Sequence, residues 1–216
     1  MMIRPVDWSV VIAGRWNRAI LTPAGIAKRL FGIDNASQIR VAVPLDGVSP
    51  YQVRHPEHGI VAMTDDNRII ILATRNTYEN LKHAMAAGVN ALRELPVTPV
   101  TAAGFNVNYF SEGITTEIAG LFEAVIDKTV SELGKPVRAR SITRSLEYGR
   151  GVLNFTLSLD QAGFKLQCNF NLDSKNDEEL KTWLQSPLGE AEVIVGQIVA
   201  KLGLEIGETE HDEDGQ

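Results

Sequence analysis

The sequence predicts an α+β fold with a mostly antiparallel sheet and helices packed on one face. Several segments alternate between apolar and polar residues, as half-buried strands do, other segments repeat apolar residues at helical spacing, and some strands follow each other as hairpins. One order of elements, strand-helix-strand-hairpin-helix, occurs in residues 7–94 and again in residues 97–203. We therefore expect two similar halves, 1–95 and 96–204, which suggests an internal pseudo-duplication. The halves either stand apart or form one continuous domain.

The first half opens with an extended segment at residues 7–20, a long strand or a tight hairpin around Gly-Arg-Trp-Asn. A short helix should follow, because Thr22 is a favourable N-cap, Pro23 suits the first helical position and Gly32 suits the position after the end. Residues 39–45 then predict a strand.

Residues 46–59 contain two prolines and are predicted to form a loop, since each proline removes a backbone donor and restricts the residue before it. A hairpin should come next, with strands near residues 59–64 and 68–74. The Asp-Asp-Asn stretch between these strands tolerates turn dihedrals.

Two longer helices are predicted from apolar stripes. The first should begin with a capping-box pair, Asn76 and Glu79. The second should span residues 118–133 and stop at Gly134. Residues 97–110 lie between the two helices and predict a strand.

The second half continues with a strand at residues 138–148, a hairpin at 151–172 and a last helical region that Pro187 kinks or restarts. Pairing Leu159 with Phe164 places all the apolar residues of the hairpin on one face, and a slip of one residue would scatter them. This register is the most specific structural prediction that the sequence allows.

The net charge of −6 belongs to the end of the chain. Residues 205–216 contain six acidic residues and no Lys or Arg, so the rest has 27 − 6 = 21 acidic residues against 21 basic ones. We expect an acidic disordered tail at 205–216 and a neutral body. A neutral body argues against nucleic acid as a partner, because binding phosphates requires a basic surface.

A reducing, cytoplasmic location is expected. The single cysteine, Cys168, cannot form an internal disulfide, and its place on the apolar side of the hairpin predicts a small buried side chain. The start of the chain lacks the pattern of a secretory signal, and no apolar run reaches the roughly 18 residues of a membrane-spanning helix. We therefore expect no membrane association.

The common signatures of nucleophilic, nucleotide-binding and metal-binding sites are absent from the sequence, so we predict no catalytic residue and no cofactor. The one local cluster comprises His55, Glu57 and His58, whose side chains suit zinc or iron. A metal site needs three or four ligands, and nothing in the sequence shows that His83 or His211 converges on this cluster. We therefore predict a polar loop and no metal.

The side of the 151–172 hairpin that should face water is almost uncharged, and so is the matching side of the 97–110 strand. Solvated sheet faces usually carry Lys, Glu, Arg and Thr, whereas charge depletion is typical of interface cores. The candidate binding face comprises Asn106, Asn108, Asn154, Thr156, Gln167, Asn169 and Asn171.

Two functions follow as hypotheses. The first is a non-catalytic partner-binding or assembly protein that uses this amide-rich face and is a homo-oligomer, so that its partner is a second copy or another protein. The second is an enzyme or small-ligand-binding protein whose site is assembled from dispersed strand and loop residues, which need no sequence motif. The competing interpretation is that this face is merely solvated and binds nothing.

Overall fold

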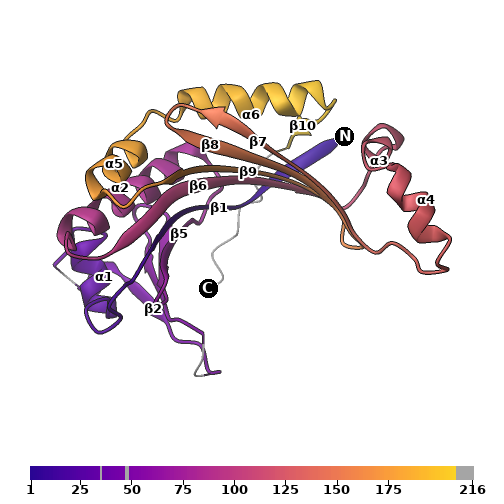
Figure 1. Cartoon of the computed structure of the whole chain (residues 1–216). Coiled ribbons are helices and arrows are strands. Elements are labelled where there is room, and N and C mark those ends of the chain that lie inside the picture. Colours follow the sequence, from indigo (N-terminus) through magenta and orange to yellow (C-terminus); the bar gives the residue numbers. More distant parts are fainter. Residues whose placement is uncertain (35, 47–48, 208–216) are drawn as a thin grey trace.

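The computed structural model describes residues 1–34, 36–46 and 49–207, and in this part of the chain ten strands form a single sheet (Figure 1). Nine strands follow the order β2-β3-β4-β5-β1-β6-β9-β8-β7, in which all neighbours are antiparallel, and β10 pairs with β1 in parallel. The strands are β1 (Met2–Gly14), β2 (Arg40–Ala42), β3 (Gln52–His55), β4 (Ile60–Thr64), β5 (Arg68–Ala73), β6 (Val100–Ser111), β7 (Arg140–Tyr148), β8 (Gly151–Leu159), β9 (Phe164–Asp173) and β10 (Glu205–Ile206).

Helices cover one face of this sheet, which confirms the predicted α+β class. Figure 1 shows α2, α5 and α6 on the upper side of the arched sheet, whereas the lower, concave side carries none of these three. The α-helices are α1 (Pro23–Arg29), α2 (Tyr78–Glu94), α3 (Thr116–Leu121), α4 (Val125–Ser131), α5 (Asp177–Leu184) and α6 (Gly189–Lys201), and η1 (Ala36–Gln38) is a 3-10 turn. None of the helices in the described part is long and apolar enough to cross a membrane.

The two predicted halves share the sheet, with β1 and β6 side by side at its centre. Outward from β1 come β5, β4 and β3, and outward from β6 come β9, β8 and β7. The halves also differ, because β2 has no counterpart and the two helices α5 and α6 follow β9 where α2 alone follows β5. The internal duplication and the boundary near residue 95 stay predictions.

The register of the β8–β9 hairpin is the predicted one, with Leu159 opposite Phe164 and Leu157 opposite Leu166. Cys168 is fully buried on the same side, and Phe170 stacks on Phe105 of β6 at 4.6 Å between ring centroids. The helix-covered face of the sheet therefore holds the core.

Three predicted elements differ from the structure. The predicted loop at residues 46–59 contains β3, which pairs on both sides because its two prolines lie outside the strand. The predicted helix at residues 118–133 is divided into α3 and α4. The capping box is also wrong: Thr77 caps α2 by accepting from the Asn80 backbone, while Asn76 bonds the backbone of β1.

Of the two forms predicted for residues 7–20, the structure has the long strand, which starts earlier, at Met2, and contains a bulge. Asp7 has a φ of 52°, and the pairing with β6 shifts between Val6 and Ser9. This extra residue turns Trp8 into the core, where it contacts the rings of Tyr78 and Tyr109.

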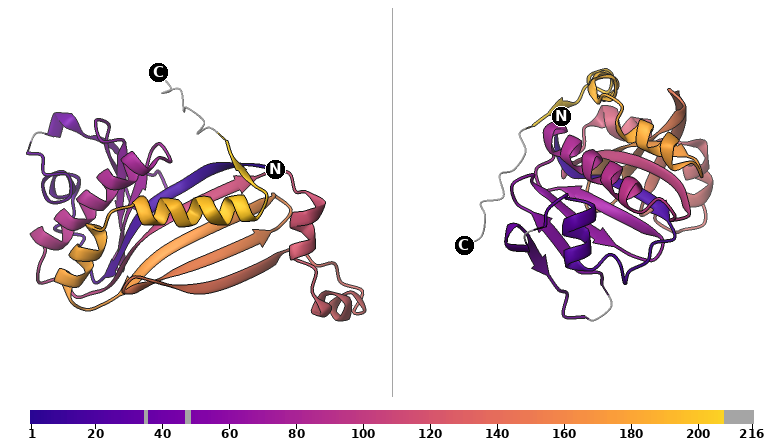
Figure 2. Two further views of the ribbon diagram at one scale, coloured as in Figure 1. Left: turned by 90° about the horizontal axis from the view of Figure 1, so that it is seen from above. Right: turned by 90° about the vertical axis from the view of Figure 1, so that its left-hand side faces the viewer.

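Residues 112–139 leave the sheet between β6 and β7 and carry α3 and α4; we call this segment the arm. Both Figure 1 and Figure 2 show the arm beyond the ends of the strands, and in Figure 2 it extends toward the β7 side of the sheet. Arg140, the first residue of β7, donates from Nε to Asp127 Oδ2 at 2.6 Å and so ties the arm to the start of that strand.

The first residues of the predicted disordered tail form a strand. Glu205 and Ile206 form β10, and the backbone N–H groups of Glu205 and Gly207 donate to Met1 and Ile3. These first residues are thus ordered by main-chain hydrogen bonds that side-chain patterns do not reveal. Residues 208–216 of the predicted tail lie outside the described residues.

Candidate functional site

All seven candidate residues lie on the sheet face opposite α2, α5 and α6. Directly paired residues of antiparallel strands share a face, and Asn106 pairs with Asn169, which in turn pairs with Asn154. A second set of pairs joins Asn108 to Gln167 and Gln167 to Thr156, and Asn171 lies one pair further along, opposite Val152 and Gly104. We call this surface the open face.

A continuous chain of side-chain hydrogen bonds crosses the open face over five strands. Ser145 Oγ donates to Asn154 Oδ1 at 2.8 Å, and Asn154 Nδ2 donates to Asn169 Oδ1 at 3.2 Å. Asn169 Nδ2 donates to Asn106 Oδ1 at 2.8 Å, and Asn106 Nδ2 donates to Ser9 Oγ at 3.0 Å. We call these five residues the amide row.

The amide row fixes the orientation of its members and keeps hydrogen-bonding capacity free. Every bond runs in the same direction, from β7 toward β1, so each bond polarises the next one. An asparagine side chain offers two N–H donors and two acceptor lone pairs. Each asparagine of the row uses one donor and one lone pair within the row, which leaves one of each for a partner.

The other candidate residues are bound more locally. Asn108 Nδ2 donates to the Asp7 carbonyl of the β1 bulge at 3.2 Å, and Asn171 Nδ2 donates to Asp173 Oδ1 at 2.8 Å. The hydroxyls of Thr156 and Thr143 lie 3.0 Å apart. The structure therefore places these residues beside the amide row but does not link them into it.

The open face continues as an apolar surface over the first half of the chain. Ser9 of the amide row pairs with Leu72, which pairs with Val61, and Val11 pairs with Ile70, which pairs with Met63. Val11, Met63, Ile70 and Leu72 are half-buried, and Val61 is 7% exposed. These residues were not among the predicted candidates, although the unbroken apolar runs of β4 and β5 are the signal of strands that are apolar on both sides.

The three histidines that the sequence could not bring together do meet. His55 and His58 stack at 4.3 Å between ring centroids, and His58 lies 4.6 Å from His83 of α2. Within residues 1–34, 36–46 and 49–207, no group of three or more His, Cys, Asp or Glu side chains is arranged to hold a metal ion.

Burial lowers the pKa of His55, and the neighbouring His58 lowers it further, while Glu57 raises it. His55 is 1% exposed, and its Nδ1 has no hydrogen-bond partner in the described part of the chain. The neutral imidazole is therefore the form that the fold favours.

The environment of Cys168 does not suit a nucleophile. Burial raises the pKa of its thiol to about 12, so the thiolate required for attack is not populated near neutral pH. Gly149, in the glycine pair after β7, has a φ of +55° and serves the tight turn to β8.

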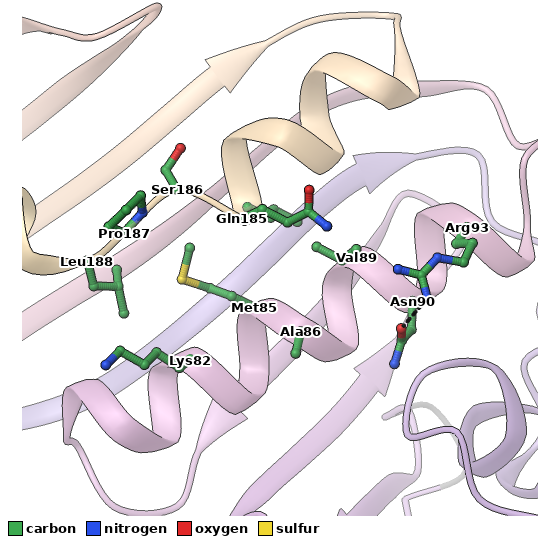
Figure 3. A pocket seen from close by; sticks show the side chains of 11 residues that line it. Lys82, Met85, Ala86, Val89, Asn90, Arg93, Gln185, Ser186, Pro187 and Leu188 are labelled. Carbon is green, nitrogen blue, oxygen red and sulfur yellow. Dashed lines mark hydrogen bonds between the residues drawn. The ribbon is translucent and has the colours of Figure 1, made fainter.

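Among the hollows of the described residues, two lie on the helix side. The first, of about 400 Å³, separates α2 from the connection between α5 and α6, and Figure 3 shows Met85 and Val89 facing Gln185 to Leu188 across it. Its only charged lining residues in the described chain are Lys82 and Arg93.

The second hollow, of about 440 Å³, lies at the far end of β7, and we call it the Tyr148 pocket. The rings of Tyr148 and Trp183 form its aromatic wall in a T-shaped contact at 5.6 Å. Arg150 pairs with Glu179 at 2.9 Å on the rim, and Glu190 adds a second carboxylate.

No model of a protein family matches the chain, and no curated protein matches it in sequence.

Proposed function

We propose that this chain is a non-catalytic binding protein, cytoplasmic and homo-oligomeric, that docks another protein chain on its open face. The amide row carries this proposal. Five polar side chains from five strands form one hydrogen-bonded line across a face that none of the three covering helices α2, α5 and α6 occupies.

The row favours a contact with protein for an energetic reason. Amides bring donors and acceptors to an interface without the desolvation cost of ions, and those of the row are already held in place before a partner arrives. The apolar surface beside the row supplies area whose burial stabilises a complex. A polar line next to an apolar patch, with few charges, is the composition of an interface core.

Protein is a better partner for this face than nucleic acid. The three rows of candidate residues carry amides and hydroxyls, and the sequence without residues 205–216 is formally neutral. A phosphate backbone would find no dense set of cations to neutralise it.

A second candidate function rests on the Tyr148 pocket. Arg150, Glu179 and Glu190 converge there from the β7–β8 turn, α5 and α6 beside two aromatic rings, as in a small-ligand site. An enzyme or a small-ligand-binding protein with a dispersed site remains the alternative proposal, and saturation of Trp183 fluorescence by a defined small molecule would support it.

The experiment compares photo-crosslinking from two exposed glutamines in cells of the source organism. A photoreactive residue at Gln167, on the open face, should form one or a few defined protein adducts, whereas the same residue at Gln197, on α6, should not. Asn154→Lys with Asn169→Glu should abolish the adducts while the fold stays intact, because the two new charges face each other across paired strands. Equal adducts from both positions, or adducts that survive the double substitution, would refute the proposal.

A further inference from the structure

We infer that a second copy of this chain pairs antiparallel along the free edge of β7, and that the arm of each copy occupies the Tyr148 pocket of the other. This inference goes beyond the proposed function, because it assigns self-association to the β7 edge of the sheet, where the amide row ends at Ser145.

The edge is the first observation. β7 ends the order of the sheet and runs for nine residues without Pro or a bulge in its pairing with β8; it carries the charged residues Arg140, Arg144 and Glu147, and Arg144 Nη1 donates to the Thr143 carbonyl at 2.8 Å. Its residues from Thr143 to Glu147 are exposed. Proteins usually protect a long free edge with prolines, bulges or charges, because its unpaired N–H and C=O groups recruit another strand; on β7 only the charges are present. The opposite edge, β2, has only three residues.

Apolar side chains flank this edge on the helix side. Leu146 is 45% exposed on β7, and Phe155 of the neighbouring β8 is half-buried and packs against the core. The helix layer thus covers the sheet incompletely at β7. A second copy that extends the sheet would also cover this strip.

The arm is the second observation. Ile126 is 64% exposed and Leu133 is 72% exposed, so the arm presents apolar side chains that its own chain does not cover. The ion pair between Arg140 and Asp127 holds the arm at the start of β7, and Figure 2 shows it on the β7 side of the sheet.

The Tyr148 pocket lies at the other end of the same strand. When two β7 strands pair antiparallel, the Arg140 end of each lies against the Tyr148 end of the other. The arm of one copy then arrives at the pocket of its partner, and the symmetry repeats the contact. Antiparallel pairing also brings exposed Arg138, just before β7, toward exposed Glu147 and Glu190 at the far end of the partner's β7.

A second copy fits these features better than an unrelated protein. A twofold contact requires a surface and its complement on one chain, and here the donor arm and the receiving pocket lie at opposite ends of one edge strand. The pairing closes on itself, since each copy uses its single long edge once. The expected product is a dimer and not a filament.

The test measures the mass of the full chain by light scattering after gel filtration, from micromolar to 100 µM concentrations (an order-of-magnitude range for stable and weak dimers). We expect twice the chain mass of 23.7 kDa. Leu146→Lys and, separately, Ile126→Asp should each weaken the dimer by roughly tenfold or more, because each places a charge in the contact. Val97→Lys, at a residue that is 92% exposed and far along the chain from β7, is the matched control and should leave the dimer unchanged.

A disulfide between copies tests the arm directly. A chain with Ile126→Cys, mixed with a chain carrying Pro187→Cys, should give an oxidised heterodimer, and the native Cys168 is buried and does not compete.

A monomer throughout the concentration range would overturn the inference, and so would a dimer that resists both charge substitutions. A dimer lost only in Asn154→Lys with Asn169→Glu would place self-association on the open face. Leu146→Lys should keep the Gln167 adducts, so failure of this inference and failure of the proposed function can be told apart.

Discussion

Removing the side chain of Asn169 should interrupt the amide row at its centre. This side chain accepts from Asn154 at 3.2 Å and donates to Asn106 at 2.8 Å, and both bonds are partly buried. A protein hydrogen bond contributes about 0.5–1.5 kcal/mol net, and water can replace part of each bond at a half-exposed site. We therefore expect Asn169→Ala to lower the free energy of unfolding by about 1–2 kcal/mol. Ser145→Ala, which removes one exposed bond at the end of the row, should cost less than about 0.5 kcal/mol.

Urea unfolding followed by circular dichroism measures these differences. Gln167→Ala is the matched control, because it lies on the same strand and the same face, two residues away, and subtracts the effect of alanine on strand propensity. A double-mutant cycle between Asn169 and Asn106 should give a coupling energy of about 0.5 kcal/mol or more. If Asn169→Ala costs no more than Gln167→Ala, the row does not order these side chains, and the argument for a prepared interface is lost.

Two further predictions concern the core and pH. Leu157→Asp should destabilise the fold by about 3 kcal/mol or more, because Leu157 is 4% exposed opposite Leu166 and a carboxylate there would lack a partner; a urea midpoint equal to the parent's would contradict the observed register. The lowered pKa of His55 means that the unfolded chain binds a proton more readily than the folded one. The stability that the neutral His55 contributes is fully present above the unfolded-state pKa of about 6.5 and declines as the pH falls below that value. Thermal melts from pH 7.5 to 5 should therefore show a fall in melting temperature, and this fall should be smaller in His55→Phe.

The strands could be predicted where one face is buried and the other is polar. The alternation from Leu153 to Leu159 and from Phe164 to Phe170 allows only one register that gathers the apolar residues, and the structure has that register. The same alternation placed the candidate amides together on the opposite face. Local chemistry also sufficed for α1, because Thr22 accepts from the Gly25 backbone as its N-cap.

Features that depend on distant partners could not be predicted. β3 has too few residues to show a period and forms because β2 and β4 pair with it on both sides. Thr77 caps α2 in place of the predicted Asn76, because the Asn76 side chain is hydrogen-bonded to the backbone of Trp8 and Pro5, which lie about 70 residues earlier in the chain. The ring contact between His83 and His58 likewise depends on how α2 lies against the β3–β4 turn.

The full extent of the amide row could not be predicted from the sequence for the same reason. The sequence gives residue types, and the pairing of β6, β9 and β8 then places Asn106, Asn169 and Asn154 in one line. Ser9 and Ser145 complete that line from β1 and β7, and neither was a candidate, because a lone serine on an expected strand carries no signal. Only the order of strands in the sheet, with β1 next to β6 and β7 next to β8, brings the two serines to the ends of the row.

The two proposed surfaces are compatible because they belong to different parts of one sheet. Antiparallel pairing of β7 with its copy needs a twofold axis perpendicular to the sheet, and such an axis keeps the same face upward in both copies. Both amide rows would then lie on one side of the dimer, each ending at Ser145 on the strand next to the axis. A partner with two equivalent binding segments could engage both rows at once, and the second contact would benefit from a high effective concentration. Loss of the dimer in Leu146→Lys should therefore weaken the capture of a bivalent partner more than that of a monovalent one, although the amide row itself is untouched.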